Sequence, residues 1–311
     1  MPRYKVAVLS SISPAAKARL EEVAEILPSE RLGDVEGIYL DSEVRVDAKF
    51  LDGAQKARVI ASKSVGYDLV DVGELTRRGI PFSNTRGALT ETVADTILAL
   101  ILMVMRDFVH GGVDWVRSGE WMNDQPPLAV DPAGKTLGIV GMGAIGFALA
   151  KRARVCGMEI VYHNRSRRDD DGDVGATHLA FDDLLRRADC IALTLPLNSE
   201  TKGMFGAKQF GLMKPTAFFV NGARGKIVDT QALYDALAGK KLAGAALDVT
   251  DPEPLPPDHP LLKLPNVVVL PHIASATTET RNRMAVLAVE NLIAGLEGKQ
   301  MPTLVNGSLS S

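Results

Sequence analysis

The sequence predicts an α/β protein of two domains. Its 311 residues are enough for two domains of ordinary size, and 46% of them are hydrophobic, which suffices for two packed cores. In the second half, short apolar runs alternate with stretches of helical length, as in a doubly wound parallel sheet. A glycine motif joins one of these runs to the helix after it. We expect one domain to comprise residues 1–98 and 285–311, and the other residues 99–284.

Charge and composition narrow the partners to small molecules. Lys and Arg total 35 against 38 Asp and Glu, and this net charge of -3 gives no basic face of the size that nucleic acid needs. The longest apolar run, residues 97–105, is far shorter than the roughly 20 residues that span a bilayer. The N-terminus lacks the pattern of a signal peptide. Cys156 and Cys190 lack the spacing of a zinc site or disulfide framework, so we expect free thiols, no metal and a cytoplasmic location.

The first domain begins as a strand followed by a helix. The run "YKVAVLS" alternates like a strand, and Ser13 and Pro14 then provide an N-cap and a first helical residue for "SPAAKARLEEVAEIL". At helical spacing, the apolar face of this helix comprises Leu20, Val23, Ala24 and Leu27. Further short strands are expected at "GIYL", "RVIAS" and "IPFSN", which together predict a small open α/β unit.

A long helix leads into the second domain. Thr90 opens the capping pattern "TETV" ahead of an apolar helix that runs towards Val109, and a turn-rich segment follows. The strands expected after it are "TLGIV", "MEIVY", "DCIALTL", "AFFVN", "LAGAALD" and "NVVVL". Because these strands alternate with helices, they predict a parallel sheet.

The glycine motif predicts a Rossmann-type dinucleotide site. Gly141, Gly143 and Gly146 have the spacing G-x-G-x-x-G between a strand and a helix. The first glycine permits a tight turn, the second lets a pyrophosphate approach the backbone, and the third lets the helix pack on the strand. The anion would then lie at the helix N-terminus, where Ala144 and Ile145 stand.

The residues after the next strand bear on the choice of cofactor. An NAD-binding version carries Asp or Glu there to bind the ribose 2′-OH, but this chain has His163 or Asn164 at that position. Arg165, Arg167 and Arg168 follow and could bind a 2′-phosphate, which favours NADP(H) over NAD(H). The alternative is a solvated turn in which the three aspartates after them pair with the arginines.

Three later strands are each followed by a reactive residue: Arg224, Glu253 (with Asp248) and His272. Since ligands of open α/β sheets bind beyond the carboxyl ends of the strands, we expect these residues to converge. Reduction of a 2-keto acid needs a hydride, a proton for the carbonyl oxygen and a cation for the carboxylate. The cofactor, His272 and Arg224 would supply these in turn, while Glu253 would favour the imidazolium and fix its orientation.

These motifs resemble those of the D-isomer-specific 2-hydroxyacid dehydrogenases. The resemblance covers nearly the whole chain and is carried by "SVGYD", "LTETVADT", "KTLGIVGMGAIG", "LTLPLNSETKGMFG", "VNGARGKIVD", "LDVTDPEPLPPDHPLL" and "LPHIASAT". Within the family the chain is most similar to glyoxylate/hydroxypyruvate reductases, including those that also reduce 2-ketogluconate. The resemblance implies a flavodoxin-like substrate domain, to which the last helix, beginning near Thr278, returns.

The resemblance also implies roles for individual residues. Arg224, Glu253 and His272 match the family's catalytic Arg, Glu and His. The substrate residues would be Val65 and Gly66, whose backbone N–H groups hold the carboxylate, with Leu40 and Asp41 on the pocket wall. Besides the glycine loop, the implied cofactor contacts are Thr90, Asn164, Arg165, Ser166, Arg168, Leu195, Pro196, Thr201 and, for the carboxamide, Asp248.

The chain departs from the family pattern in three places. Arg86 stands where a proline is common, and Ala274 replaces the usual glycine after His272, which would tighten the pocket. The segment "DQPPLAV" lacks the aromatic residue that some reductases project into a neighbouring subunit. Trp115 and Trp121 are expected to pack the arm that, in the family, builds a homodimer.

Other functions of the same fold fit the sequence less well. An NAD-dependent enzyme such as phosphoglycerate dehydrogenase would favour an acid near residue 164, and formate dehydrogenase has glutamine where Glu253 stands. A non-catalytic, dinucleotide-sensing corepressor would not need Arg224, Glu253 and His272 together. We therefore expect an NADPH-dependent reductase of small 2-keto acids.

Overall fold

The computed structural model describes residues 4–307, which form two compact units. Residues up to Leu89 and from Ala276 onward form unit 1, and Thr90–Ser275 form unit 2. The boundaries expected from the sequence, after residues 98 and 284, both fall inside helices, α4 (Thr90–Met105) and α10 (Thr278–Leu296). An unbroken helix packs as one element, so the chain changes unit in the loop before each helix instead.

Unit 1 is built on a five-stranded parallel sheet with the strand order β2-β1-β3-β4-β5. The strands are β1 (Tyr4–Val8), β2 (Ala24–Leu27), β3 (Gly37–Leu40), β4 (Val59–Ser62) and β5 (Phe82–Ser83). The helices are α1 (Pro14–Glu21), α2 (Ala48–Gly53), α3 (Val72–Arg77) and α10. This order is the flavodoxin-like one, so the predicted fold class of the smaller unit is confirmed.

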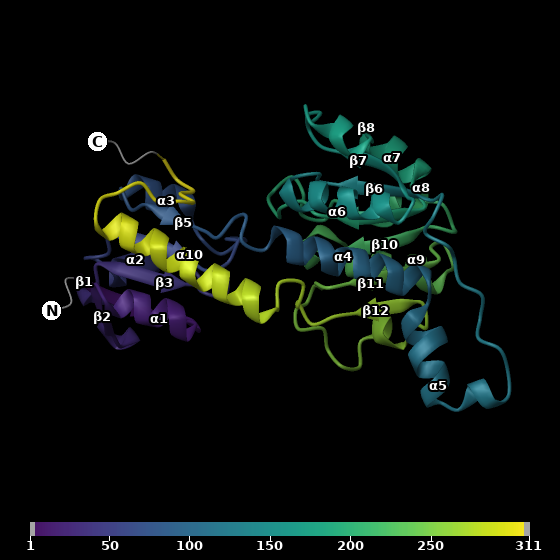
Figure 1. The fold of residues 1–311 in the computed structure, drawn as a ribbon, viewed down its shortest axis with the longest axis horizontal. Helices are drawn as coiled ribbons and strands as arrows, with labels where there is room; N and C mark the ends of the chain where they lie inside the picture. The colour runs from purple at the N-terminus through teal and green to yellow at the C-terminus, as the bar shows by residue number, and fades with distance from the viewer. Residues whose placement is uncertain (1–3, 308–311) are drawn as a thin grey trace. The chain divides into compact units, whose positions relative to one another are not determined.

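Helices cover both faces of this sheet (Figure 1). On one face α1 and α10 pack over Val6, Tyr39 and Val59, in a core that α10 supplies with Leu292 and Leu296. The residues on the other face, among them Leu51 of α2 and Leu75 of α3, form a second core. Although α10 is separated from α1 by most of the sequence, the two helices share one layer, so the chain's last helix completes the first unit.

The first predicted helix ends earlier than the sequence pattern indicated. Ser13 caps it as expected, because its Oγ accepts a hydrogen bond from the Ala16 N–H at 3.3 Å, but α1 ends at Glu21. The residues "AEIL" form strand β2, so the predicted helical face that included Ala24 and Leu27 is wrong. Pairing of this run with β1, in a parallel register, overrides its helical spacing.

Unit 2 is built on a seven-stranded parallel sheet with the order β12-β11-β10-β9-β6-β7-β8. The strands are β6 (Thr136–Val140), β7 (Glu159–His163), β8 (Ala176–His178), β9 (Cys190–Leu193), β10 (Phe218–Asn221), β11 (Gly244–Leu247) and β12 (Val267–Val269). The first strand, β6, has neighbours on both sides, and the chain reverses its direction of winding there. This is the doubly wound Rossmann arrangement that the sequence predicts, with β8 as a short edge strand that the sequence pattern did not indicate.

Helices also cover both faces of the larger sheet (Figure 1). The α-helices of this unit, besides α4, are α5 (Trp115–Arg117), α6 (Ala144–Val155), α7 (Phe181–Arg187), α8 (Ala207–Leu212) and α9 (Thr230–Ala238). Helices α4 and α6 pack together on one face, and α7, α8 and α9 enclose the core around Phe205 and Phe219 on the other. Helix α4 ends at Met105, short of the expected Val109, and a π-helical turn (Phe108–Asp114) follows it.

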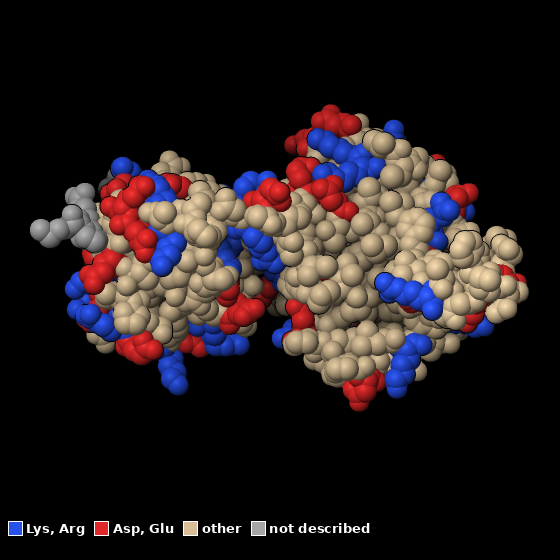
Figure 2. All heavy atoms as spheres, turned by 60° about the horizontal axis from the view of Figure 1, so that its bottom comes forward, with Lys and Arg blue, Asp and Glu red and all other residues tan. Residues whose placement is uncertain are grey.

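The surface carries mixed charge. On the face shown in Figure 2, cations and anions alternate over both units. Among residues 4–307, no helix combines the length and the apolarity that crossing a membrane would require.

Candidate active site

The glycine loop lies between β6 and α6, at the carboxyl edge of the larger sheet. Gly141 has a φ of +95°, in the region that favours glycine, and a Cβ there would lie 2.6 Å from the Leu195 Cβ. A Cβ at Gly146 would lie 2.8 Å from the Thr194 Oγ1, which itself donates to the Gly141 carbonyl. These two positions therefore require glycine, and they fix the start of α6 against the loop after β9.

The middle glycine leaves room for a ligand. A Cβ at Gly143 would meet nothing within 4 Å, so open space lies beside the N-terminus of α6. The first N–H groups of a helix have no partner within it, which leaves those of Ala144 and Ile145 to bind an anion. The open backbone and these donors fit a dinucleotide pyrophosphate.

The loop after β7 is tied to the glycine loop through one carbonyl. The Met142 oxygen accepts hydrogen bonds from the Asn164 Nδ2 at 3.2 Å and from an Arg168 guanidinium nitrogen at 3.1 Å. The Arg168 guanidinium also lies 4.8 Å from the centre of the Phe147 ring and pairs with Asp170 at 2.6 Å. The residues expected at the adenosine end of a cofactor are thus held against those expected at its pyrophosphate.

The other two arginines of this loop have different environments. Arg167 pairs with the buried carboxylate of Asp171 at 2.7 Å, and the Tyr162 hydroxyl donates to the same carboxylate at 3.0 Å. The hydrogen bond from Arg167 lowers the pKa of Asp171, so the arginine neutralises a buried negative charge. Arg165 is almost fully exposed and lies 3.3 Å from Glu200. Ser166 is also exposed.

The loop after β9 is closed by its own side chains. The Thr201 hydroxyl donates to the Pro196 carbonyl at 2.7 Å, and the Asn198 side chain accepts from the Thr201 N–H at 3.0 Å. Thr90 is the first residue of α4. The expected cofactor residues of unit 2 thus lie in the glycine loop, in the loops after β7, β9 and β11, and at the start of α4.

A histidine and a carboxylate form a hydrogen-bonded pair near the ends of β11 and β12. The Nδ1 of His272 lies 2.6 Å from the Oε1 of Glu253. This hydrogen bond is the largest cause that lowers the pKa of Glu253, and the charge of Arg224 acts in the same direction. The carboxylate is therefore charged at neutral pH, and the Nε2 of His272 has no hydrogen-bond partner within residues 4–307. One ring nitrogen is fixed, and the other is available for proton transfer.

The Arg224 loop is built to lie against the loop that carries Glu253. The Asn221 side chain caps it by donating to the Arg224 carbonyl at 3.0 Å and accepting from the Ala223 N–H at 3.0 Å. A Cβ at Gly225 would overlap the Thr250 carbonyl, so only glycine permits this approach. The arginine, the glutamate and the histidine are therefore brought to one edge of one sheet.

Asp248 positions the histidine turn. Its buried carboxylate accepts hydrogen bonds from the N–H groups of Ile273 at 2.8 Å and Ala274 at 2.9 Å. His272 has a φ of +54°, a left-handed conformation that is uncommon for a residue with a Cβ, and its N–H donates to the Asp248 carbonyl. Backbone strain of this kind occurs at functional sites, where surrounding bonds maintain it. Ala274 itself is buried.

The expected substrate residues lie at the carboxyl edge of the sheet in unit 1. Leu40 is fully buried in the core at the end of β3, and its carbonyl accepts from the Lys63 N–H. Asp41, the next residue, is partly exposed and lies 3.6 Å from the Lys63 ammonium. Asp41 is therefore at the surface, whereas the side chain of Leu40 contributes to packing.

The loop after β4 is supported from the end of the chain. The Asn84 side chain donates to the Val65 carbonyl at 2.9 Å, and the Asn84 carbonyl accepts from the Thr303 hydroxyl. Thr303 is held in turn by the buried side chain of Asn291 on α10. The N–H groups of Val65 and Gly66 have no acceptor in the described part of the chain, so they are available to a carboxylate. The adjacent Arg86 is exposed.

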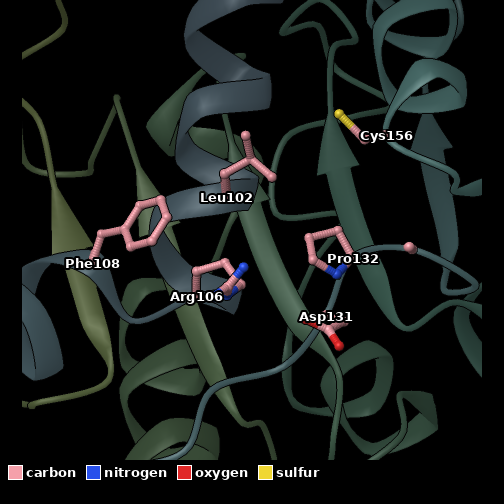
Figure 3. A pocket seen from close by; sticks show the side chains of 7 residues that line it. Leu102, Arg106, Phe108, Asp131, Pro132 and Cys156 are labelled. Atoms are coloured by element: carbon pink, nitrogen blue, oxygen red, sulfur yellow. The ribbon is translucent and has the colours of Figure 1, made fainter. Parts of the chain in front are cut away.

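A separate pocket lies at the opposite edge of the sheet in unit 2. It has a volume of about 390 Å³ and is lined by the end of α4, the segment before β6 and the residue after α6 (Figure 3). Its lining residues are Leu102, Arg106, Phe108, Asp131, Pro132, Ala133 and Cys156. Because β6 begins near this pocket and ends at the glycine loop, the pocket is distinct from the candidate active site.

Several supporting residues were missed by sequence reasoning. Asn221 and Gly225 lie in the run "VNGARGKIVD" and Phe147 directly follows the glycine motif, but their contacts depend on loops distant in sequence. His178, which matches no catalytic position, donates through Nε2 to the Asn164 carbonyl at 3.1 Å. The run of aspartates after the arginines indicated that ion pairs would form in this loop, but it did not specify which aspartate pairs with which arginine.

Comparison with known proteins identifies the family. Residues 98–274 match the model of the D-isomer specific 2-hydroxyacid dehydrogenase NAD binding domain, which is more than half of the chain. The chain belongs to the D-isomer specific 2-hydroxyacid dehydrogenases. A member named glyoxylate reductase, from Korarchaeum cryptofilum, is 46% identical over 89% of this chain and 84% of its own length.

Two further dehydrogenases of this family are similar over nearly their full length. Glyoxylate/hydroxypyruvate reductase B of Klebsiella pneumoniae is 44% identical over 95% of this chain and 92% of its own. The crystal structure of an NADPH-dependent glyoxylate/hydroxypyruvate reductase from Sinorhizobium meliloti, in complex with NADP and malonate, superposes with a TM-score of 0.89. Its identity is 33%, and the match covers 97% of each chain. The resemblance that the motifs indicated is thereby confirmed.

The Asp248 contacts of this dehydrogenase predict the effect of Asp248→Asn. The new amide nitrogen would face a backbone N–H in place of an acceptor, leaving one buried donor unpaired, which costs about 1–3 kcal/mol. We expect the free energy of unfolding in urea to fall by that amount and turnover to fall with it. Asp258→Asn makes the same change at an exposed residue and should stay within about 0.5 kcal/mol. Unchanged stability and turnover in Asp248→Asn would contradict this role.

Proposed function

We propose that the chain catalyses the NADPH-dependent reduction of small 2-keto acids, glyoxylate and hydroxypyruvate among them, to D-2-hydroxy acids. The observation that carries the proposal is the hydrogen bond between Glu253 and His272, with Arg224 near the same carboxylate. Two relatives that are similar over most of their length are named for the reduction of glyoxylate or hydroxypyruvate. The further substrate 2-ketogluconate belongs to the same chemical class.

His272 would act as the proton donor. Bound nicotinamide would supply the hydride to the carbonyl carbon. The Nε2 of His272 would hold the proton that the carbonyl oxygen acquires, and Glu253 would keep the ring charged and oriented through Nδ1. Because the pKa of Glu253 is lowered, this carboxylate remains an anion when the histidine is protonated. Asp248 would act indirectly, by holding the turn on which His272 lies.

Cations and backbone donors would hold the substrate. The guanidinium of Arg224 can bind a carboxylate through two parallel hydrogen bonds and polarise the adjacent carbonyl. In unit 1, the N–H groups of Val65 and Gly66 would bind a carboxylate, and Asp41 lies at the same edge of that unit's sheet.

The proposed preference for NADP(H) rests on the loop after β7. Asn164 stands where a carboxylate would repel a 2′-phosphate, and the guanidinium of Arg168 is held between Met142 and Phe147. Arg165, which is exposed, could approach the same phosphate. A relative with 33% identity is described as NADPH-dependent.

We further propose that the protein is a homodimer of the cytoplasm. Between α4 and β6 the chain exposes a group of large apolar side chains, which in a monomer would be in contact with water. They are Phe108, Val113, Val116, Trp121, Met122 and Leu128. The two cysteines are free thiols, which suits a reducing compartment.

The proposed reaction is tested by initial rates of cofactor oxidation at subsaturating, equal concentrations of NADPH and NADH. We expect turnover of glyoxylate and hydroxypyruvate, with a higher rate for NADPH. A higher rate with NADH would retain the reaction but reject the cofactor preference. Absence of turnover with both cofactors, on these and larger 2-keto acids, would reject the enzyme.

The proton donor is tested by the turnover of two variants. His272→Ala should reduce turnover by about 10²- to 10⁴-fold, the usual contribution of a general acid, while the affinity for NADPH is retained. Glu253→Gln removes the carboxylate charge that lies against the Nδ1 of the ring, so turnover should also fall while the affinity for NADPH is retained. Unchanged turnover in Glu253→Gln would mean that the carboxylate does not support the proton donor.

The homodimer is tested by sedimentation equilibrium. Wild type should have twice the mass of one chain at micromolar concentration. The double substitution Trp121→Ser and Met122→Ser removes two exposed apolar side chains and should shift the protein towards the monomer. Arg117→Ala, on the same segment, should leave the mass unchanged. A monomeric wild type at this concentration would reject the proposal.

A further inference from the structure

The guanidinium of Arg168 is held on several sides. Its Nε and one terminal nitrogen donate to the two carboxylate oxygens of Asp170, at 2.7 and 2.6 Å. The other terminal nitrogen donates to the Met142 carbonyl at 3.1 Å, and the ring of Phe147 lies 4.8 Å away. The bidentate face of this arginine is therefore occupied by an anion that belongs to the chain itself.

A phosphate would compete for the same donors. Arginine binds carboxylates and phosphates through the same planar fork, which offers two donor pairs, Nε with one terminal nitrogen and the two terminal nitrogens together. The terminal nitrogen that both pairs share is one of the two that bind Asp170. In Arg168 the pair formed by Nε and its neighbouring nitrogen is the one that Asp170 occupies. The remaining nitrogen is directed to the Met142 carbonyl, which is part of the glycine loop.

We propose that Asp170 is a specificity-determining residue that occupies the phosphate-binding face of Arg168, so that a ribose 2′-phosphate binds there by displacing the Asp170 carboxylate. The inference rests on the proposed function, because it concerns the same cofactor site. It goes further in assigning a competitor to that site. A cofactor without the 2′-phosphate requires no displacement, so Asp170 narrows the difference in affinity between NADPH and NADH.

The surroundings of Asp170 allow this exchange. Its side chain is 42% exposed, so water can solvate the carboxylate once it leaves Arg168. The neighbouring Asp171 could not be released in the same way, because it is buried and bound by both Arg167 and Tyr162. Partly exposed ion pairs contribute little net free energy, since water replaces the lost partner. A doubly charged phosphate can therefore displace the Asp170 carboxylate from Arg168.

The inference is tested by isothermal titration of the protein with 2′,5′-ADP and 5′-AMP. These probes differ only in the 2′-phosphate, and neither requires turnover. In Asp170→Asn we expect the dissociation constant for 2′,5′-ADP to fall by about two- to fivefold, the size of a partly exposed ion pair. The constant for 5′-AMP should change less, so the ratio between the two probes should rise. A purely structural effect would move both constants together.

Asp169→Asn is the matched control. It removes the same charge from the adjacent residue, which is exposed and for which no ion pair is found between residues 4 and 307. Its ratio between the probes should equal that of wild type. An equal gain in Asp169→Asn would assign the effect to general charge and overturn the inference. Weaker or unchanged binding of 2′,5′-ADP in Asp170→Asn would also overturn it, because Asp170 would then orient Arg168 or play no part.

The outcome also separates this inference from the proposed cofactor preference. If wild type binds both probes equally, the preference for NADP(H) fails. A selective gain for 2′,5′-ADP in Asp170→Asn would then still support competition, and no gain would overturn it. If neither probe binds to any variant, both the dinucleotide site and the inference are rejected.

Discussion

Parallel pairing of the strands determines where this protein can place its chemistry. Every strand of both sheets pairs in parallel with its neighbours, so each strand needs a crossover, and all carboxyl ends meet at one edge of each sheet. The loops at these edges can carry polar residues without disturbing a core that is apolar on both faces. In unit 2 they bring the glycine loop, Arg224, Glu253 and His272 to one edge. The parallel topology therefore decides where these residues lie, and their side chains decide what chemistry is possible there.

Features that depend on short-range spacing were predictable from the sequence. The glycine loop requires a turn with positive φ at Gly141 and close packing at Gly146, and both requirements are properties of the local chain. The positions of Arg224 and His272 followed from the ends of apolar runs. The strand at Ala24–Leu27 was mispredicted because its helical spacing is local, whereas its pairing with β1 is not.

The partners of the arginines could not be predicted, because several pairings satisfy the same sequence. Arg167 and Arg168 are each followed closely by aspartates, and local charge alone favours no arrangement. The choice is made by residues from other elements: Tyr162 on β7 binds Asp171, and Phe147 on α6 lies beside Arg168. The same holds for Asp248, whose contacts are with the backbone of the loop after β12. Tertiary contacts therefore decide which charged side chains are paired within the chain and which are available to bind a ligand.

The bonds from α10 to the loop after β4 connect residues 291–303 to the loop that we propose to bind a carboxylate. After α10 the chain runs beside β5, where Leu304 forms an antiparallel bridge with Ser83 and the Val305 N–H donates to the Phe82 carbonyl. Thr303 then reaches the Val65 loop through Asn84. A purification tag or a truncation that disturbs this segment would therefore disturb the Val65 loop as well, even though the two lie far apart in sequence.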